Sequence, residues 1–205
     1  MGVAEFAESF VPEDAVLTAA RARAVEIGVE PISAATGAAL KLLAAATRAR
    51  TAVEIGTDTG VSGLYLLRGM RDGVLTSIDP EAEAQRLARA AFNADGIPTS
   101  KARLINGRAL DVLPRLTDGA YDIVFCASDR REYPDVLAQV IRLVRVGGLV
   151  VFDGVAVAAD PSARDAEAGG VRRLLELVKE DGRLSPAIIP VGSGLLAAVV
   201  SPVED

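Results

Sequence analysis

Between residues 51 and 180 the sequence repeats one pattern five times: a short apolar run is followed by a segment with helical periodicity. The runs are too short for helices and do not alternate with polar residues, which is typical of strands covered on both faces. Successive strand–helix units predict an α/β fold with a parallel sheet between helices. The predicted strands are 51–55, 74–78, 102–106, 121–126 and 148–153, and the helices that follow them are 61–70, 80–95, 108–116, 134–144 and 164–180.

Both ends of the chain depart from this repeat. The periodicity of residues 12–27 and 33–47 predicts two N-terminal helices. Residues 185–191 and 195–201 are apolar runs joined by Gly-Ser-Gly at 192–194, a loop typical of a hairpin. We therefore expect the last strand to run antiparallel, at or near the sheet edge.

Composition narrows the function. The 205 residues are 50% hydrophobic and 24% charged and contain no linker, which predicts a single domain over 1–205. The chain has no histidine, which excludes His-dependent nucleophilic catalysis and His-ligated zinc. Its lone Cys126 cannot form an intramolecular disulfide, and the net charge of −6 argues against nucleic acid as a partner. No apolar run is long enough for a membrane helix, so we expect a cytoplasmic protein without a membrane partner.

The loop after the first strand is the first place to look for chemistry, because ligands bind beyond the carboxyl ends of strands in such sheets. Gly56 and Gly60 let the backbone turn sharply and approach a ligand, and Glu54 precedes them. A dinucleotide fingerprint would need glycines where Asp58 and Val61 stand. The loop therefore argues against an NAD-linked oxidoreductase.

Asp79 follows the second strand, 23 residues after Gly56, where a carboxylate can accept hydrogen bonds from both hydroxyls of a ribose. Together with Glu54 it makes the site acidic, which suits a cationic nucleoside better than a phosphate. The plainer alternative is that the glycines only make a tight turn and that Asp79 only caps the next helix. The combination on a strand–helix ladder favours a cofactor site.

Five segments in this order resemble the S-adenosylmethionine-dependent O-methyltransferases of the catechol and caffeoyl-CoA class, in an actinobacterial form: VEIGTDTGVSGLYLL, LTSID, INGRALDVLPRL, YDIVF and RVGGLVVFD. The resemblance extends from about Ile32 to the C-terminus. It implies a Rossmann-like sheet of seven strands with a reversed last strand. It also implies that the helices within 1–48 form a lid over the cofactor and part of a homodimer interface.

The resemblance implies S-adenosylmethionine as the cofactor. Asp79 would hold the ribose hydroxyls, and Ser62 would hold the carboxylate of the methionine end. Asp58 stands where relatives often have glycine or another residue. The other implied cofactor contacts are Glu54, Gly56, Thr57 and Gly60 at the methionine end, Gly107, Arg108 and Ala109 at the adenine, and Ala127.

The same resemblance bears on metal binding. Metal-dependent members carry Asp-Ala-Asp-Lys after YDIVF and Asp-Asn at the end of the fifth strand, and the first Asp, the last Asp and the Asn hold a divalent ion. Here Ala127 and Gly154 replace two of these ligands and leave Asp153. Because magnesium and calcium need several oxygen ligands, we expect no divalent metal.

Three residues remain candidates for catalysis. Asp129 and Asp153 are acids at strand ends, and either would serve as a general base. Arg130 stands where the family has a lysine, and a guanidinium stays protonated and cannot act as a base. It can orient a substrate carboxylate or phenolate, or it is an ordinary surface arginine.

The sequence thus predicts a metal-independent O-methyltransferase that uses S-adenosylmethionine and a small phenolic or catechol-like acceptor. The loss of two metal ligands leaves an alternative open. In that alternative the chain is a catalytically weak or inactive methyltransferase-like protein that binds S-adenosylmethionine or S-adenosylhomocysteine as a sensor or partner.

Overall fold

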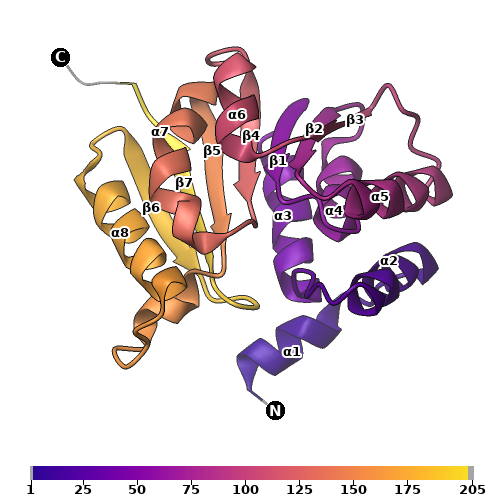
Figure 1. Ribbon diagram of the computed structural model, residues 1–205, viewed down its shortest axis with the longest axis horizontal. Helices are drawn as coiled ribbons and strands as arrows, with labels where there is room; N and C mark the ends of the chain where they lie inside the picture. The colour runs from indigo at the N-terminus through magenta and orange to yellow at the C-terminus, as the bar shows by residue number, and fades with distance from the viewer. Residues whose placement is uncertain (1, 203–205) are drawn as a thin grey trace.

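The computed structural model describes residues 2–202; Met1 and residues 203–205, which the predicted domain includes, lie outside it. The molecule is built on a seven-stranded sheet with helices on both faces (Figure 1). The strand order is β3-β2-β1-β4-β5-β7-β6. The strands are β1 (Thr51–Ile55), β2 (Val74–Asp79), β3 (Ala102–Asn106), β4 (Tyr121–Cys126), β5 (Val144–Asp153), β6 (Leu184–Ile189) and β7 (Leu195–Val200).

The pairing of the strands confirms the predicted fold class. β1 lies inside the sheet and pairs in parallel with both β2 and β4, so the strand order reverses there. β7 pairs antiparallel with β5 on one side and with β6 on the other. The reversed last strand is therefore next to the edge, and β6 forms the edge itself. Because β6 runs in the direction of β5, the β6–β7 loop lies at the carboxyl end of the sheet.

The helices form one layer on each face of the sheet (Figure 1). Neighbouring residues of one strand divide between two hydrophobic cores: Val53 packs with one helical layer and Ala52 with the other. This division explains the continuous apolar runs of the sequence. One layer contains α3 (Ala34–Ala46), α4 (Val61–Met70) and α5 (Ala82–Ala94), and the other contains α6 (Ala109–Val112), α7 (Tyr133–Leu143) and α8 (Ala166–Glu180).

Three helices precede β1 in the described part of the chain, whereas the sequence predicted two. The additional helix is α1 (Val3–Phe10), followed by α2 (Ala15–Glu26) and α3. Asp14 and Ser33 cap α2 and α3 through hydrogen bonds to backbone N–H groups, but α1 has no such side-chain cap and buries none of its residues. The start signal is therefore absent at α1. Its apolar residues Val3, Phe6 and Phe10 do recur at helical spacing, and this amphipathic pattern is the signal that could have identified the helix.

Short 3-10 helices occupy three of the connections. They are η1 (Leu113–Arg115), η2 (Arg130–Glu132) and η3 (Val155–Ala159), and two of them, η2 and η3, directly follow the carboxyl ends of β4 and β5. The predicted helix 108–116 is divided into α6 and η1 at Pro114, which lacks the N–H that a continuing α-helix needs. None of the described helices is both long and apolar enough to cross a membrane.

Candidate active site

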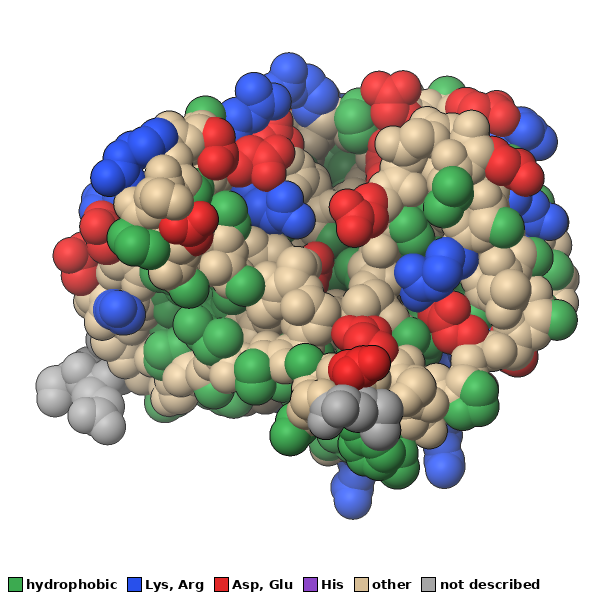
Figure 2. Space-filling view, turned by 90° about the horizontal axis from the view of Figure 1, so that it is seen from below, with side chains coloured by type: hydrophobic (Ala, Val, Ile, Leu, Met, Phe, Trp, Pro, Cys, Tyr) green, Lys and Arg blue, Asp and Glu red, His purple; other side chains and the backbone are tan. Residues whose placement is uncertain are grey.

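Two adjoining cavities lie at the carboxyl end of the sheet. The first, of about 540 Å³, lies between the β1–α4 loop, the end of β2 and the start of α6. The second, of about 600 Å³, lies between the α2–α3 connection, η2, the end of β5 and the β6–β7 loop. Asp58, Ala127 and Ser128 line both. Figure 2 views the molecule from the bottom of Figure 1 and shows acidic and basic side chains around a depression.

The β1–α4 loop owes its shape to residues in the left-handed region. Gly56 has φ +92° and Gly60 has φ +88°. A Cβ at Gly56 would lie 2.5 Å from the carbonyl oxygen of Ala127, so only glycine allows these two segments to approach so closely. Asp58 also adopts a positive φ, of 43°, a conformation that aspartate tolerates better than most side chains. Glycine adopts a positive φ readily, so this backbone is also compatible with the glycine that relatives often have at position 58.

Asp79 holds this loop in place and also lines the first cavity. Its Oδ2 accepts the backbone N–H groups of Thr57 at 2.9 Å and Asp58 at 3.0 Å. Its Oδ1 accepts the N–H of Glu81 at 2.8 Å, just before α5. Asp79 therefore makes the contact at the start of α5 that the alternative without a cofactor predicts. The same carboxylate also holds the β1–α4 loop and faces the first cavity.

Glu54 lies beneath the loop and lines neither cavity. It is fully buried; Ser62 Oγ donates to its Oε1 at 2.5 Å, and Ser77 Oγ donates to its Oε2. Thr57 Oγ1 and Ser77 Oγ share a further hydrogen bond of 2.6 Å. Burial raises the pKa of Glu54 to about 8, although the two serine hydroxyls oppose the shift. Of the residues predicted at the methionine end, only Gly56 lines the first cavity; Glu54, Thr57, Gly60 and Ser62 support it from below.

The residues predicted at the adenine lie across the first cavity from this loop. Arg108 and Ala109 line it, and Arg108 Nη2 forms an ion pair with Glu132 at 2.6 Å. Gly107 donates its backbone N–H to the carbonyl oxygen of Asp79 at 3.1 Å, which joins the ends of β3 and β2. The structure thus brings the predicted ribose and adenine residues to one cavity.

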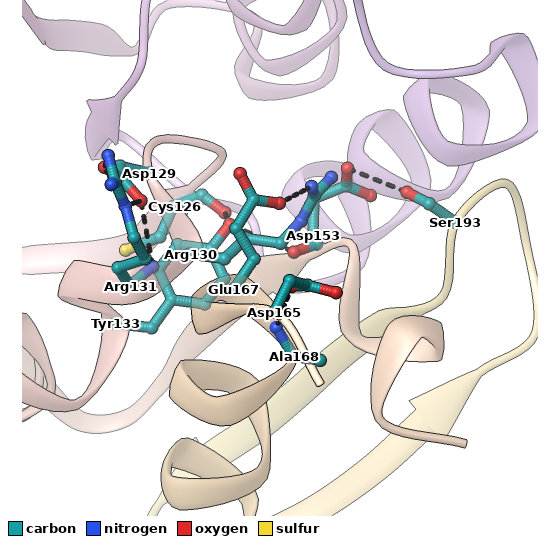
Figure 3. Close-up of polar contacts among 10 residues, drawn as sticks. All are labelled: Cys126, Asp129, Arg130, Arg131, Tyr133, Asp153, Asp165, Glu167, Ala168 and Ser193. Atoms are coloured by element: carbon teal, nitrogen blue, oxygen red, sulfur yellow. Dashed lines mark hydrogen bonds and ion pairs between the residues drawn. The ribbon is translucent and has the colours of Figure 1, made fainter. Parts of the chain in front are cut away.

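The two candidate bases face different cavities. Asp129 lines the first, and its carboxylate accepts hydrogen bonds of 2.8 and 2.9 Å from Arg131 Nε, which hold the pKa of Asp129 below its usual value. Asp153 lines the second and is 7% exposed. Its Oδ2 accepts a hydrogen bond from Ser193 Oγ at 3.1 Å, and burial raises its pKa. Figure 3 shows the Asp129–Arg131 pair on one side of Arg130 and Asp153 on the other.

Arg130 lies along the second cavity, where Nη1 forms an ion pair with Glu167 of α8 at 2.9 Å (Figure 3). Its side chain is 34% exposed. A Cβ at Gly154 would lie 2.1 Å from Arg130 Nε and 2.6 Å from Cζ. The guanidinium therefore fills the space beside Gly154, and Arg130 is part of the cavity wall as well as the surface.

These residues do not fit a divalent ion. Ala127 and Gly154 offer no side-chain oxygen, and the Arg130 cation occupies the space beside Gly154. A fixed positive charge there opposes the binding of a metal cation. Among residues 2–202, no group of three or more His, Cys, Asp or Glu side chains is arranged to hold a metal ion.

Several polar residues of the second cavity were not among the predicted site residues, and two of them, Tyr133 and Ser193, contact Asp153. Tyr133 is buried, and its hydroxyl lies within hydrogen-bond distance of the carbonyl oxygens of Cys126, 3.2 Å, and Asp153, 3.0 Å, which ties β4 to β5. Ser193 lies in the β6–β7 loop and binds Asp153. Topology could have pointed to Ser193. The first strand of the C-terminal hairpin runs parallel to β5, so the loop of the hairpin lies at the carboxyl end of the sheet, beside the site.

Comparisons with known proteins agree with this architecture. The model of the O-methyltransferase family matches residues 9–200. A Mycobacterium tuberculosis protein of strain H37Rv, named "Probable O-methyltransferase Rv1220c", is 50% identical over 197 residues, which cover 94% of this chain and 88% of that protein. The chain therefore belongs to the S-adenosylmethionine-dependent O-methyltransferase family, as the sequence motifs predicted.

Solved structures give the same result. The O-methyltransferase TomG of Streptomyces achromogenes, in complex with S-adenosylmethionine, is 30% identical with a TM-score of 0.87, and the match covers 98% of this chain and 100% of TomG. An O-methyltransferase of Bacillus cereus, in complex with S-adenosylhomocysteine, is 25% identical with a TM-score of 0.86 over 96% of both chains. Each is a protein that this chain resembles over nearly its whole length.

Proposed function

We propose that this chain methylates a hydroxyl of a small phenolic or catechol-like acceptor without a divalent metal, with S-adenosylmethionine in the first cavity and the acceptor in the second. The observation that carries the proposal is that the two cavities share a wall. Asp58, Ala127 and Ser128 line both, so ligands in the two cavities lie next to each other. Such proximity is the main requirement of an in-line transfer, and orientation alone lowers a barrier by about 7–11 kcal/mol.

Bound S-adenosylmethionine would supply an electrophilic methyl group, so the protein has mainly to bind and orient. Asp79 suits the ribose. Its Oδ2 accepts two backbone N–H groups, those of Thr57 and Asp58, whereas its Oδ1 accepts one, that of Glu81, and so keeps a free lone pair for a hydroxyl. Arg108 and Ala109 would border the adenine. Glu54 and Ser62, which are hydrogen-bonded to each other beneath the β1–α4 loop, would shape the methionine end of the site through that loop.

On the acceptor side, Asp153 is the better candidate for the general base. It lines the second cavity, and burial raises its pKa toward the range in which a carboxylate accepts a proton readily. Asp129 faces the first cavity and is neutralised by Arg131, which makes it a weaker base. Metal independence is supported by Ala127, Gly154 and the position of the Arg130 guanidinium.

The helices before β1 have a proposed role as lid and homodimer surface. Val25 of α2 and the α2–α3 connection line the second cavity, where a lid would act. The apolar side chains Phe6 and Phe10 of α1 are 49% and 68% exposed and pack against each other. Sedimentation velocity of the full chain tests the dimer, and a monomer at all concentrations would contradict it.

The alternative, a protein that binds the cofactor without turnover, draws support from the missing metal ligands at positions 127 and 154. A methyl-transfer assay over a panel of phenols and catechols, with and without chelator, separates the two. We expect turnover that chelator and added magnesium leave unchanged. Stimulation by magnesium would contradict metal independence, and binding of S-adenosylhomocysteine without turnover of any acceptor would favour the alternative.

A further inference from the structure

Three buried polar atoms beside the second cavity lack a hydrogen-bond partner among the described residues: Arg130 Nε, Asp153 Oδ1 and Ser128 Oγ. Arg130 and Asp153 carry opposite charges and line the same cavity, yet no ion pair joins them within residues 2–202. An unpaired buried polar group destabilises a protein, and a charged one does so most. This arrangement indicates a ligand with one group for each side chain.

The second cavity has another arginine, Arg21, but each of its three guanidinium nitrogens already donates to an acceptor within the protein. Arg21 forms a bidentate pair with Glu13, with distances of 2.9 Å from Nε and 2.6 Å from Nη2, and its Nη1 donates to the carbonyl oxygen of Ile32 at 2.8 Å. Arg130 has one hydrogen-bond acceptor among the described residues, Glu167. A guanidinium carries five N–H donors on three nitrogens, and in Arg130 two of these nitrogens, Nε and Nη2, have no acceptor among the described residues. Arg130 is therefore the cation of this cavity with more donors left for a ligand.

Three features fix the position of Arg130. Glu167 of α8 holds Nη1 at 2.9 Å. Gly154 leaves the room that the guanidinium fills, as described above. A Cβ at Gly170 of α8 would lie 2.4 Å from the carbonyl oxygen of Arg130, so a glycine there lets α8 pack directly on η2. A cation positioned by an ion pair and by two glycines is preorganised for binding a ligand.

We propose that the acceptor is a hydroxyaromatic carboxylate, whose carboxylate pairs with the Arg130 guanidinium while its neighbouring hydroxyl donates a hydrogen bond to Asp153 Oδ1. A planar guanidinium matches a carboxylate in geometry and charge. The hydroxyl would give Asp153 Oδ1 the donor that it lacks. This inference rests on the proposed function, because it assigns the acceptor class to the same second cavity.

The test is calorimetric binding to the full chain saturated with S-adenosylhomocysteine. The probes are 2-hydroxybenzoate and its neutral isostere 2-hydroxybenzamide. We expect the wild type to bind the carboxylate at least about tenfold more tightly, as a charge-assisted pair worth about 1.5–3 kcal/mol requires. Arg130→Gln should abolish the preference, and Arg130→Lys should retain part of it. Asp153→Asn should remove the advantage of 2-hydroxybenzoate over benzoate.

Arg173→Gln is the matched control, because Arg173 is an exposed arginine of α8 that pairs with Glu176 away from both cavities. It should leave both affinities unchanged. Unaltered affinity for S-adenosylhomocysteine in Arg130→Gln shows that the variant is folded. Three outcomes would overturn this inference and leave the proposed function intact. They are equal affinity of the wild type for the two probes, no binding of 2-hydroxybenzoate, and a preference that survives Arg130→Gln. Failure of the wild type to bind S-adenosylhomocysteine would instead contradict the proposed function.

Discussion

The Arg130 guanidinium lies where a side chain at position 154 would begin: a Cβ on Gly154 would be 2.1 Å from Arg130 Nε. The two positions are therefore coupled, since the arginine at 130 requires the absence of a side chain at 154. The same contact places a permanent cation at the end of β5. The contact between Arg130 and Gly154 thus explains why position 154 has no side chain and why the end of β5 does not suit a metal cation.

This coupling predicts that Gly154→Ala destabilises the protein much less when Arg130 is also replaced. Gly154 has φ +77°, so alanine is strained there in either background, and the strain cancels in a double-mutant cycle. We expect Gly154→Ala to cost about 2 kcal/mol from overpacking and strain. In Arg130→Ala the cost should fall by about 1 kcal/mol. Urea unfolding of the four proteins measures the cycle, and additive free energies would contradict the coupling.

The second prediction concerns Asp79, whose carboxylate faces the first cavity and anchors the β1–α4 loop. Asp79→Asn removes the charge and leaves one oxygen to receive the N–H groups of Thr57, Asp58 and Glu81. Affinity for S-adenosylhomocysteine should fall by about 100-fold, which is the worth of hydrogen bonds to a charged group. Calorimetry measures this affinity, with Glu83→Gln as the control because Glu83 is exposed and binds only Arg86. Unchanged affinity would remove the ribose assignment.

The third prediction is a pH dependence of stability that originates at Glu54. Burial raises the pKa of Glu54 to about 8 in the folded protein, from 4.5 for an unperturbed carboxyl. The folded state therefore retains a proton that the unfolded chain releases, so its contribution is full below pH 4.5 and is lost as pH rises through 8. At about 1.4 kcal/mol per pKa unit, the loss approaches 5 kcal/mol at most.

Urea unfolding of cofactor-free protein at pH 5 and pH 8 measures this loss. Glu54→Gln should remove most of the pH dependence of stability over this interval and leave the contributions of Asp58 and Asp153. Burial raises the pKa of Asp58 to about 6 and also raises that of Asp153, so both act in the same direction as Glu54. Equal pH slopes in the wild type and Glu54→Gln would show that the glutamate is ionised in the folded protein.

The fold was predictable from sequence because its strongest signals are local. Strand 51–55 coincides with β1, since its residues 52–55 are all buried and the run lies between the exposed Arg50 and the turn at Gly56. Helix α1 was missed because it has no capping side chain to mark its start and is only eight residues long. Its apolar residues Val3, Phe6 and Phe10 do recur at helical spacing, but they stay exposed and no core contact accompanies that pattern.

The sequence pointed to residues of both cavities, among them Arg130 and Asp153 of the second, but not to how these residues divide between the two. Gly56, Asp79, Arg108 and Ala109 follow strand ends directly, and the parallel topology alone brings them together. The separation of Asp129 from Asp153 depends on how η2 turns, which is set by α8 packing on it at Gly170, forty residues later in the chain. Contacts between segments so distant in sequence leave no local pattern to read.

That separation supplies the last prediction, on which acid assists the transfer. Because Asp153 faces the second cavity and Asp129 is held by Arg131, Asp153→Asn should lower kcat by about 100-fold or more, as the loss of a general base does. Asp129→Asn should lower kcat far less and should act mainly on KM for S-adenosylmethionine, since Asp129 lines the first cavity. Steady-state kinetics of both variants, with S-adenosylhomocysteine affinity as the check on folding, distinguishes them. A larger loss of kcat in Asp129→Asn would assign the base to the first cavity and would reverse the roles proposed for the two acids.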